Sequence, residues 1–430
     1  MRVREPRHAT TILALALLMV LAFDGAAWAA AGDLDTSFDL DGKVVTDATA
    51  NNDFGQAVAV QTDGKIVAAG FWAGQGEADF VVVRYNADGS LDPTFDGDGI
   101  AVTDLRGFAD EAFAVAIQAN GRIVVAGYTS NGTAEDFGLV RYRTDGTLDT
   151  SFSGDGKLAT NFGGDESASG LAIQTDGKIV AVGNTRTSTG VSDFAIARYM
   201  PSGALDTSFS GDGKQTTDFS GNADVANAVT IQTDGKIVVG GRTAPPTVGE
   251  DFAIARYNSD GSLDAAFSGD GMQTTDFRGG LDLITGVAVQ TNGKIVAGGS
   301  TEGSNGQDYA LARYTPVGDL DAAFSGDGLQ TTTFGFDDEI GGLAIQADGK
   351  IVAGGHSWNG STWDFSVARY RVTGVLDTTF SGDGKQMTDF GSSDDLAWDL
   401  AIQADGKIVL AGQLGTGSTT KFALARYLAA

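Results

Sequence analysis

The chain repeats one pattern of apolar and polar positions seven times. Each copy has a short apolar stretch, the turn pair Asp-Gly or Asn-Gly, and a second apolar stretch that begins after Lys or Arg. Asn, Asp and Gly adopt the positive φ angles of a two-residue hairpin turn at low cost, so each copy predicts a β-hairpin. The first stretches end 56 to 58 residues apart, at Val60, Ile117, Ile173, Ile231, Val289, Ile345 and Ile402. A period of this length makes the repeat the organising feature of the fold.

One repeat contains four predicted strands. In the first copy residues 57–60 are wholly apolar, as in a strand buried on both faces, and residues 65–70 form the second strand. The third strand, residues 79–85, alternates large and small side chains with a period of two in later copies. The fourth, near residues 100–104, belongs to the most polar column, which suits an exposed outer edge. Four antiparallel strands graded from apolar to polar are typical of one blade of a β-propeller.

The two ends of the chain predict how the ring closes. Residues 43–47 repeat the outer-strand pattern alone, whereas the last copy, through residues 422–427, supplies inner strands only. One strand at the start and three at the end make a single blade, whereas an open solenoid would carry polar capping repeats at both ends. The sequence therefore predicts an all-β fold, a seven-bladed β-propeller with four antiparallel strands per blade, closed by a one-plus-three strand clasp between the termini.

The first thirty residues differ in character from the repeats. Arg2, Arg4 and Arg7 precede an apolar run over residues 12–23, and small residues follow around Ala29. This order is typical of a secretory signal peptide, and the apolar run is short for a transmembrane helix. We therefore expect residues 1–30 to be a signal peptide and residues 31–430 to form the propeller. The protein is then secreted, periplasmic or held at the cell surface, without membrane insertion after cleavage.

Composition disfavours several kinds of function. A net charge of −28 disfavours nucleic acids and anionic membranes as partners. The chain has no Cys, and His356 is the only His after residue 30, which leaves little material for Cys or His metal sites or for histidine-based catalysis. Carboxylates are abundant, so a glycan-processing hydrolase or lyase stays an alternative, but abundance singles out none of them. We expect no catalytic residue and no cofactor.

The motifs of the repeat resemble a known family. All seven copies follow, with substitutions, the pattern Asp-Gly-x-Leu-Asp-x-x-Phe-x-Gly-Asp-Gly-Lys, Ile-Gln-x-Asp-Gly-Lys-Ile-Val and Asp-Phe-x-x-x-Arg-Tyr, over nearly everything after residue 30. This set resembles the bacterial delta-60 repeat family. The resemblance implies a secreted or surface-exposed propeller domain, and it carries no biochemical activity or catalytic residues.

Two charged positions recur in every repeat. An Arg stands near the end of the third strand, and an Asp follows it by about eight residues across the second turn. A charge among apolar residues needs a partner, and bidentate Asp–Arg pairing within each blade would provide one. Seven cation or anion sites are the alternative, but repetition in every blade favours the structural interpretation. The Arg residues are Arg84, Arg141, Arg198, Arg256, Arg313, Arg369 and Arg426, and the Asp residues are Asp35, Asp92, Asp149, Asp206, Asp264, Asp321 and Asp377.

Two loops, residues 39–42 and 96–99, resemble the start of a carboxylate-rich calcium loop. The other five copies lose the first acid, as at Ser210, and none has the full EF-hand pattern. A turn that needs Gly is the favoured interpretation. Calcium binding at these two loops is the weaker alternative.

Departures from the repeat mark the candidate ligand site. Trp72 lies between the second and third strands of the first blade, and Trp358 and Trp363 lie at the same place in the sixth. Trp398 begins the innermost strand of the seventh blade. Beside it, Asp399 stands in a column otherwise confined to Ala and Gly. Blades six, seven and one are neighbours in a closed ring, so we expect these residues to share one sector of one face, near the mouth of the channel.

His356 precedes Trp358 by two residues and is expected in the same sector. Aromatic faces beside a carboxylate suit sugar rings. The sequence therefore predicts an exported, non-catalytic binding or interaction module, with carbohydrate or another surface protein as its partner. One alternative is that the Trp rings fill gaps between blades, and another is a structural scaffold of the cell envelope. The predicted ligand-binding residues are Trp72, His356, Trp358, Trp363, Trp398 and Asp399.

Overall fold

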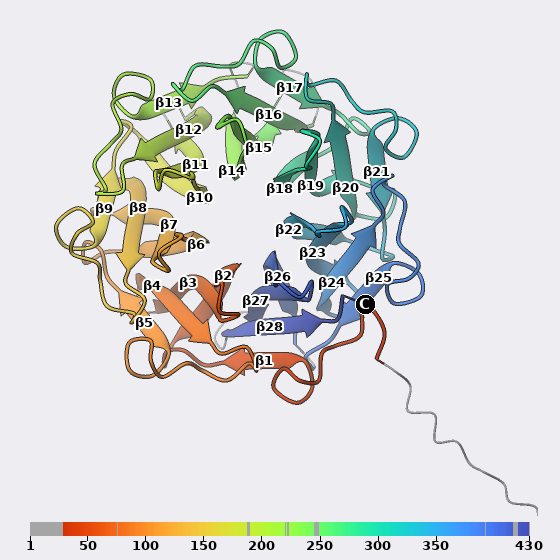
Figure 1. The fold of residues 1–430 in the computed structure, drawn as a ribbon, viewed down its shortest axis with the longest axis horizontal. Coiled ribbons are helices and arrows are strands. Elements are labelled where there is room, and N and C mark those ends of the chain that lie inside the picture. Colours follow the sequence, from red (N-terminus) through yellow and green to blue (C-terminus); the bar gives the residue numbers. More distant parts are fainter. Residues whose placement is uncertain are drawn as a thin grey trace, which may run out of the picture.

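The computed structural model describes residues 29–429, apart from residues 75, 187–189, 220, 222, 245–248, 392 and 416–419. The described residues form seven antiparallel sheets of four strands each, arranged as a ring around a central axis (Figure 1). The predicted seven-bladed β-propeller is confirmed. Within these residues there is no helix, and hence none of the length and apolar character that crossing a membrane requires. Residues 1–28 of the predicted signal peptide lie outside the described part of the chain.

Six blades are continuous in sequence. The first has β2 (Asn52–Val60), β3 (Ile66–Gly74), β4 (Glu77–Tyr85) and β5 (Ile100–Thr103). The second has β6 (Asp110–Ile117), β7 (Ile123–Ser130), β8 (Glu135–Tyr142) and β9 (Lys157–Thr160). The third has β10 (Asp165–Ile173), β11 (Ile179–Arg186), β12 (Ser192–Tyr199) and β13 (Lys214–Thr217).

The next three blades follow the same order. The fourth has β14 (Asp224–Ile231), β15 (Ile237–Thr243), β16 (Asp251–Tyr257) and β17 (Met272–Thr275). The fifth has β18 (Asp282–Val289), β19 (Ile295–Glu302), β20 (Gln307–Tyr314) and β21 (Leu329–Thr332). The sixth has β22 (Asp338–Ile345), β23 (Ile351–Trp358), β24 (Trp363–Tyr370) and β25 (Lys385–Thr388).

The seventh blade joins the two ends of the described chain. It consists of β26 (Asp395–Ile402), β27 (Ile408–Leu414), β28 (Lys421–Tyr427) and β1 (Lys43–Thr46), in that order. Lys43 pairs with Ala425 and Thr46 with Phe422, and the inner strands β26 and β2 contact each other to complete the ring. The predicted one-plus-three clasp is confirmed.

Each inner strand is longer than the predicted four residues and contains a β-bulge. In β2 the pairing with β3 shifts between Gly55 and Ala57, which leaves Gln56 as the extra residue. The glycine opposite the bulge is a geometric requirement: a Cβ on Gly70 would lie 1.8 Å from the carbonyl oxygen of Phe54. The residues at the bulge in the seven inner strands are Gln56, Phe113, Ser169, Asn227, Thr285, Gly341 and Trp398.

The apolar core consists of seven clusters, each formed between two neighbouring blades. The cluster between blades seven and one packs Ile66 and Val81 of the first blade against Val409 and Phe422 of the seventh. Phe38, in the segment before β1, is fully buried in the same cluster. Since an apolar sheet face must be covered to exclude water, each blade depends on both of its neighbours.

The predicted Arg–Asp pairs are present in every blade. Arg198 Nε lies 2.8 Å from Asp206 Oδ2, and both side chains are buried. The pairing is not bidentate as predicted, because the other guanidinium nitrogens have different partners. One donates to Ser208 Oγ at 3.2 Å, and the other donates to the carbonyl oxygen of Ser259 in the next blade. The equivalent Arg of each blade makes the same bond to its neighbour, so the pairs connect the blades around the whole ring.

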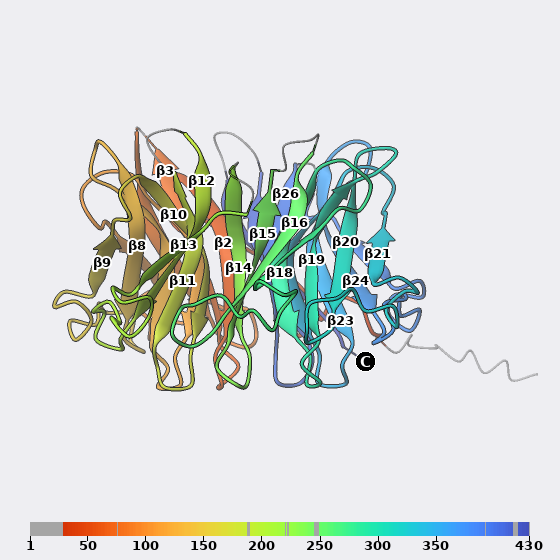
Figure 2. The same cartoon turned by 90° about the horizontal axis from the view of Figure 1, so that it is seen from above.

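The ring has two faces (Figure 2). The hairpin face, below in Figure 2, carries the Asp-Gly and Asn-Gly turns between first and second strands and the loops between third and fourth strands. The crossover face, above, carries the loops between second and third strands and the links from the outer strand of one blade to the inner strand of the next.

Candidate functional site

Four aromatic side chains gather on the crossover side of the junction between the sixth and seventh blades. Trp358 ends β23 and Trp363 begins β24, and they stand directly opposite each other in register with ring centroids 5.7 Å apart. His356 lies on the same side of β23, because side chains alternate along a strand. Its ring is 5.1 Å from Trp363 and 4.9 Å from Trp398, the bulge residue of β26. We call these four residues the aromatic group.

His356 takes over a contact that the bulge residue makes in other blades. Thr285 Oγ1 donates to the carbonyl oxygen of Ile340 in the next inner strand at 2.6 Å. In the sixth blade the bulge residue is Gly341, on which a Cβ would lie 2.5 Å from the backbone of Trp398. His356 Nδ1 instead lies 3.0 Å from the carbonyl oxygen of Ala397. Gly341 therefore leaves room for Trp398, and His356 makes the contact to the next inner strand in place of the missing side chain.

The protonation state of His356 follows from its burial. The side chain is 3 % exposed, and burial lowers its pKa to about 4, against the opposing effect of the hydrogen bond to Ala397. The imidazole is therefore neutral at pH 7, and Nδ1 carries the proton that it donates to the carbonyl oxygen. A neutral, buried ring of this kind positions its neighbours.

The three indoles of the aromatic group are partly exposed. Nε1 of Trp398 is buried and donates to no residue in the described part of the chain. The group thus presents mainly apolar ring surface to solvent. Since indole rings expose a face to apolar C–H groups and an edge to acceptors, such a surface suits a ligand that has both.

Asp399 has a role in joining the inner strands. Its Oδ2 accepts a hydrogen bond from Val58 N of the first blade at 2.9 Å, and its Oδ1 accepts one from Leu400 N at 2.8 Å. Burial raises the pKa of Asp399 to about 7, although these two hydrogen bonds oppose the rise. A Cβ on Gly342 would lie 2.7 Å from Asp399 Oδ1, which explains the small residue at that position of the sixth blade. Asp399 thus connects β26 to β2.

Trp72 does not join the aromatic group. It packs against the core cluster between blades seven and one, and its Nε1 donates to Asp79 Oδ2 at 3.1 Å. The expectation that all four Trp share one site is wrong for this residue because of strand register. Trp72 is the sixth residue after Ile66, whereas Trp358 is the seventh after Ile351, so the two project from opposite sides of equivalent strands. Counting from the hairpin would have shown this.

The two loops with a weak calcium resemblance are built as turns. Asp41 Oδ1 accepts a hydrogen bond from Lys43 N at 2.9 Å, and Asp98 Oδ1 accepts one from Ile100 N at the same distance. The equivalent Asp makes this bond in the other five copies as well. Asp39 has a positive φ of 46°, and the Ser that replaces it elsewhere has φ between 48° and 54°. These contacts support the turn interpretation, and calcium at these loops stays a prediction.

Sequence reasoning missed groups of three acids on the crossover face, of which the described residues contain four. Each combines an Asp near the start of a third strand, an Asp after the outer strand and an Asp at the start of the next inner strand, with one oxygen of each within 4.8 Å of the others. We call these groups the Asp trios. Their members lie far apart in sequence, and the signal that could have found them is their fixed position in the repeat. The trios are Asp79, Asp104 and Asp110; Asp193, Asp218 and Asp224; Asp251, Asp276 and Asp282; and Asp364, Asp389 and Asp395.

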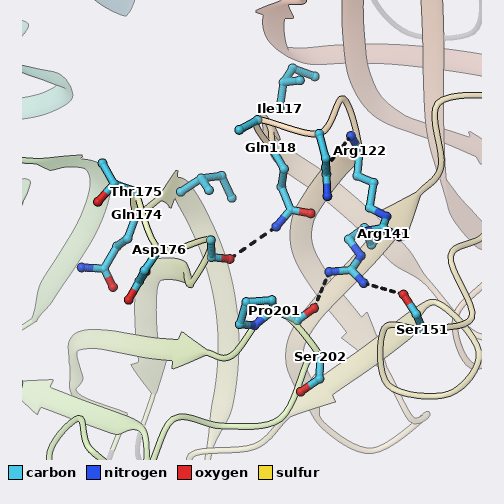
Figure 3. A pocket seen from close by; sticks show the side chains of 14 residues that line it. Ile117, Gln118, Arg122, Arg141, Ser151, Gln174, Thr175, Asp176, Pro201 and Ser202 are labelled. Carbon is cyan, nitrogen blue, oxygen red and sulfur yellow. Dashed lines mark hydrogen bonds between the residues drawn. The ribbon is translucent and has the colours of Figure 1, made fainter.

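On the hairpin face a cleft of about 770 Å³ opens between the second and third blades (Figure 3). Its polar groups serve the contact between blades: Arg141 donates to Ser151 Oγ at 3.0 Å and to the carbonyl oxygen of Pro201, and Gln118 Nε2 donates to the carbonyl oxygen of Gly177 at 3.4 Å. A similar cleft lies between the fourth and fifth blades. The cleft is therefore a feature of the scaffold.

The repeats of the chain match the model of a known protein family. The family described as "Domain of unknown function (DUF5122) beta-propeller" matches once in every blade, at residues 61–95, 118–152, 174–209, 232–267, 290–324, 346–380 and 403–429. The chain belongs to this family. The matches begin in the hairpin turn and run into the Leu-Asp-x-x-Phe loop, so they cover the scaffold that carries the Arg–Asp pairs. No curated protein matches the chain.

Solved structures resemble this DUF5122 propeller at low sequence identity. The polysaccharide lyase Uly1 aligns with a TM-score of 0.50 at 12% identity, over 90% of this chain and 91% of that chain. A streptogramin B lyase aligns with a TM-score of 0.49 at 10% identity, over 90% and 97%. The extracellular domain of BT4673 from B. thetaiotaomicron aligns with a TM-score of 0.46 at 14% identity, over 89% of this chain and 39% of that chain. At these identities the likeness shows the fold alone.

Proposed function

We propose that the protein is an exported, non-catalytic binding module that holds a carbohydrate at the aromatic group. The observation that carries the proposal is the break in the repeat at the junction of blades six and seven. The Trp358–Trp363 pair of the sixth blade stands where four other blades have small or polar pairs. Those pairs are Ala73–Ala78, Ser130–Glu135, Arg186–Ser192 and Glu302–Gln307.

The indoles of the aromatic group are more exposed than the core phenylalanine beside them. Phe365, the neighbour of His356 in register, is fully buried in the core cluster of the same junction. Trp358, Trp363 and Trp398 keep part of their surface in contact with solvent. Covering this indole surface with a ligand would remove apolar area from water. A sugar ring that stacks its C–H face on an indole would cover it.

The chemistry around the aromatic group favours binding over turnover. His356, the one histidine of the propeller, is buried and neutral and uses Nδ1 for a backbone contact. Asp399 uses both carboxylate oxygens for backbone N–H groups. Both oxygens of Asp399 are thus occupied, and His356, whose Nε2 lies 3.7 Å from Glu339 Oε2, is a weak general base because its pKa is about 4. Export rests on the charged, apolar and small-residue order of residues 1–30.

A glycan array followed by calorimetry tests the proposal. The wild-type protein should bind a saccharide, and the Trp358→Ala, Trp363→Ala double variant should lose at least about tenfold in affinity, which corresponds to about 1.4 kcal/mol. Trp72→Phe is the matched control, since it changes an indole at the neighbouring junction and should leave affinity unchanged. Failure of the wild type to bind any saccharide, or equal affinity in the double variant, would refute the site. Cleavage of the bound saccharide would refute the non-catalytic part.

A further inference from the structure

Three carboxylates converge at the same junction, beside the aromatic group. Asp364 lies next to Trp363 in β24, Asp389 follows β25, and Asp395 begins β26. One oxygen of each lies within 4.8 Å of the other two. Asp364 and Asp395 are buried, whereas Asp389 is exposed. The trio therefore has a buried floor and one side open to solvent.

Asp395 adds an observation that clustered acids alone do not provide. Its side chain is 0 % exposed, and its Oδ2 accepts a hydrogen bond from Phe390 N at 2.7 Å. Its Oδ1 is buried and accepts a hydrogen bond from no residue that the structure describes. The equivalent Oδ1 atoms of Asp110, Asp224 and Asp282 in the other trios also lack a donor among the described residues. In the seventh blade Leu414, opposite Asp395, offers no hydroxyl. A buried carboxylate oxygen without a donor is unfavourable, and a cation would satisfy it.

At two other junctions between blades, one of the three acids is replaced by a residue that can donate a hydrogen bond. Between blades seven and one, Lys421 stands in the column of Asp364, and its Nζ lies 2.9 Å from Asp47 Oδ2. Between blades two and three, Asn161 stands in the column of Asp389, and its Nδ2 donates to Asp136 Oδ1 at 2.6 Å. At these two junctions a side chain supplies the positive charge or the donor. At the sixth junction all three columns hold an acid, and a neutral donor, Asn359 Nδ2, lies 2.8 Å from Asp364 Oδ2.

We propose that Asp364, Asp389 and Asp395 bind a calcium ion. Calcium takes six to eight oxygen ligands in flexible geometry, and carboxylates on three separate segments fit this preference with waters in the remaining positions. The ion would link β24 of the sixth blade to β26 of the seventh. The site does not depend on the proposed saccharide. It lies on the face opposite the loops at residues 39–42 and 96–99, which sequence reasoning had considered.

Calorimetry with calcium chloride and luminescence of bound terbium test the proposal on the full chain. Terbium replaces calcium and emits when a nearby indole is excited, and Trp363 adjoins Asp364 in sequence. Asp395→Asn should lose one equivalent of bound calcium relative to wild type and most of the terbium emission. Asp364→Lys, which reproduces the arrangement of Lys421, should lose the same equivalent of bound calcium. Its melting temperature should rise less on addition of calcium than that of the wild type.

Two controls keep the result specific to the trio. Asp47→Asn removes a carboxylate at the seventh junction, and Asp96→Asn removes one from a hairpin-face loop; both should leave the amount of bound calcium unchanged. Absence of calcium binding by the wild type would overturn the proposal. Unchanged calcium stoichiometry in both Asp395→Asn and Asp364→Lys would overturn it as well, and so would loss of the ion in Asp96→Asn alone.

Discussion

Removal of the Asp35 carboxylate tests the clasp. Asp35 lies before β1, and its Oδ2 accepts a hydrogen bond from Arg426 Nε at 2.8 Å, across 391 residues of sequence, and forms an ion pair with Arg426 Nη2 at 2.8 Å. Burial raises the pKa of Asp35, but hydrogen bonds from Ser37 and Lys407 and the charge of Arg426 together lower it to about 2. The displacement from 3.8 to about 2 corresponds to about 2.5 kcal/mol, and breaking a buried pair costs about 3 to 5 kcal/mol. We expect Asp35→Ala to lose about 3 kcal/mol of unfolding free energy.

Asp206→Ala is the matched control. Asp206 pairs with Arg198 at the same 2.8 Å, accepts the same two bonds from Ser208, and also has a pKa lowered to about 2 by bonds and charges that outweigh burial. Its segment is covalently continuous within its blade, whereas residues 31–47 join the seventh blade through non-covalent contacts alone. Both variants should therefore lose similar free energy in urea denaturation.

Limited trypsin digestion separates the two variants. Lys43 is the one basic residue in residues 31–47, and its backbone is paired with Ala425 in the closed ring. In Asp35→Ala, local opening of the clasp should expose Lys43 to cleavage at urea concentrations where Asp206→Ala stays intact. Equal resistance at Lys43 in the two variants would refute the clasp as a separately opening unit, and an unchanged unfolding free energy would refute the value assigned to the pair.

Two further predictions concern stability. The pKa of Asp399 is raised to about 7 in the folded protein, so the stability that its protonated form contributes is present at acid pH and is lost as pH rises through 7. The shift in pKa corresponds to at most about 4 kcal/mol of unfolding free energy, which partial exposure of the side chain reduces to about 2 kcal/mol. Melting temperatures between pH 5 and pH 8 should fall less steeply in Asp399→Asn than in wild type, and an identical slope would contradict this origin. Gly355→Ala would place a Cβ 1.9 Å from the carbonyl oxygen of Glu339 and should cost more than about 2 kcal/mol in urea denaturation. Gly298→Ala, whose Cβ would meet the side chain of Leu343 at 3.1 Å, should cost much less, and equal losses would contradict the role of the bulge.

The sequence predicts the architecture well because the fold depends on local signals that recur. Each hairpin is specified by its own turn residues, and the order of strands at the ends leaves one way to complete a blade. The β-bulges were missed because an extra residue in a strand changes no turn and leaves the apolar pattern of residues 57–60 intact. The hydrogen bond that the Arg of each blade donates to the next blade was also missed. Its acceptor is a backbone carbonyl, and the position of that carbonyl depends on the angle between the two blades.

The candidate site was predicted in part. His356, Trp358, Trp363 and Trp398 meet because the sixth and seventh blades are neighbours, which follows from the ring itself. Trp72 was misplaced because the side of a strand depends on counting from a fixed point in register. The Asp trios could not be read as sites from the sequence, since the link between an outer strand and the next inner strand sets their distance in space.

The clasp also constrains the order in which the molecule can form. Leu34 pairs with Tyr427, and residues 43–46 pair with β28. The strand β1 therefore cannot pair until β28 has been synthesised. Six blades can form in sequence from local hairpins, but closing the seventh brings together segments separated by nearly the whole chain, which makes it the slowest entropic step. Until then β28 has an open edge, and the inner strands of blades one and seven lack a neighbour. The unclosed ring is therefore the species in which this protein is most exposed to association with another copy of itself.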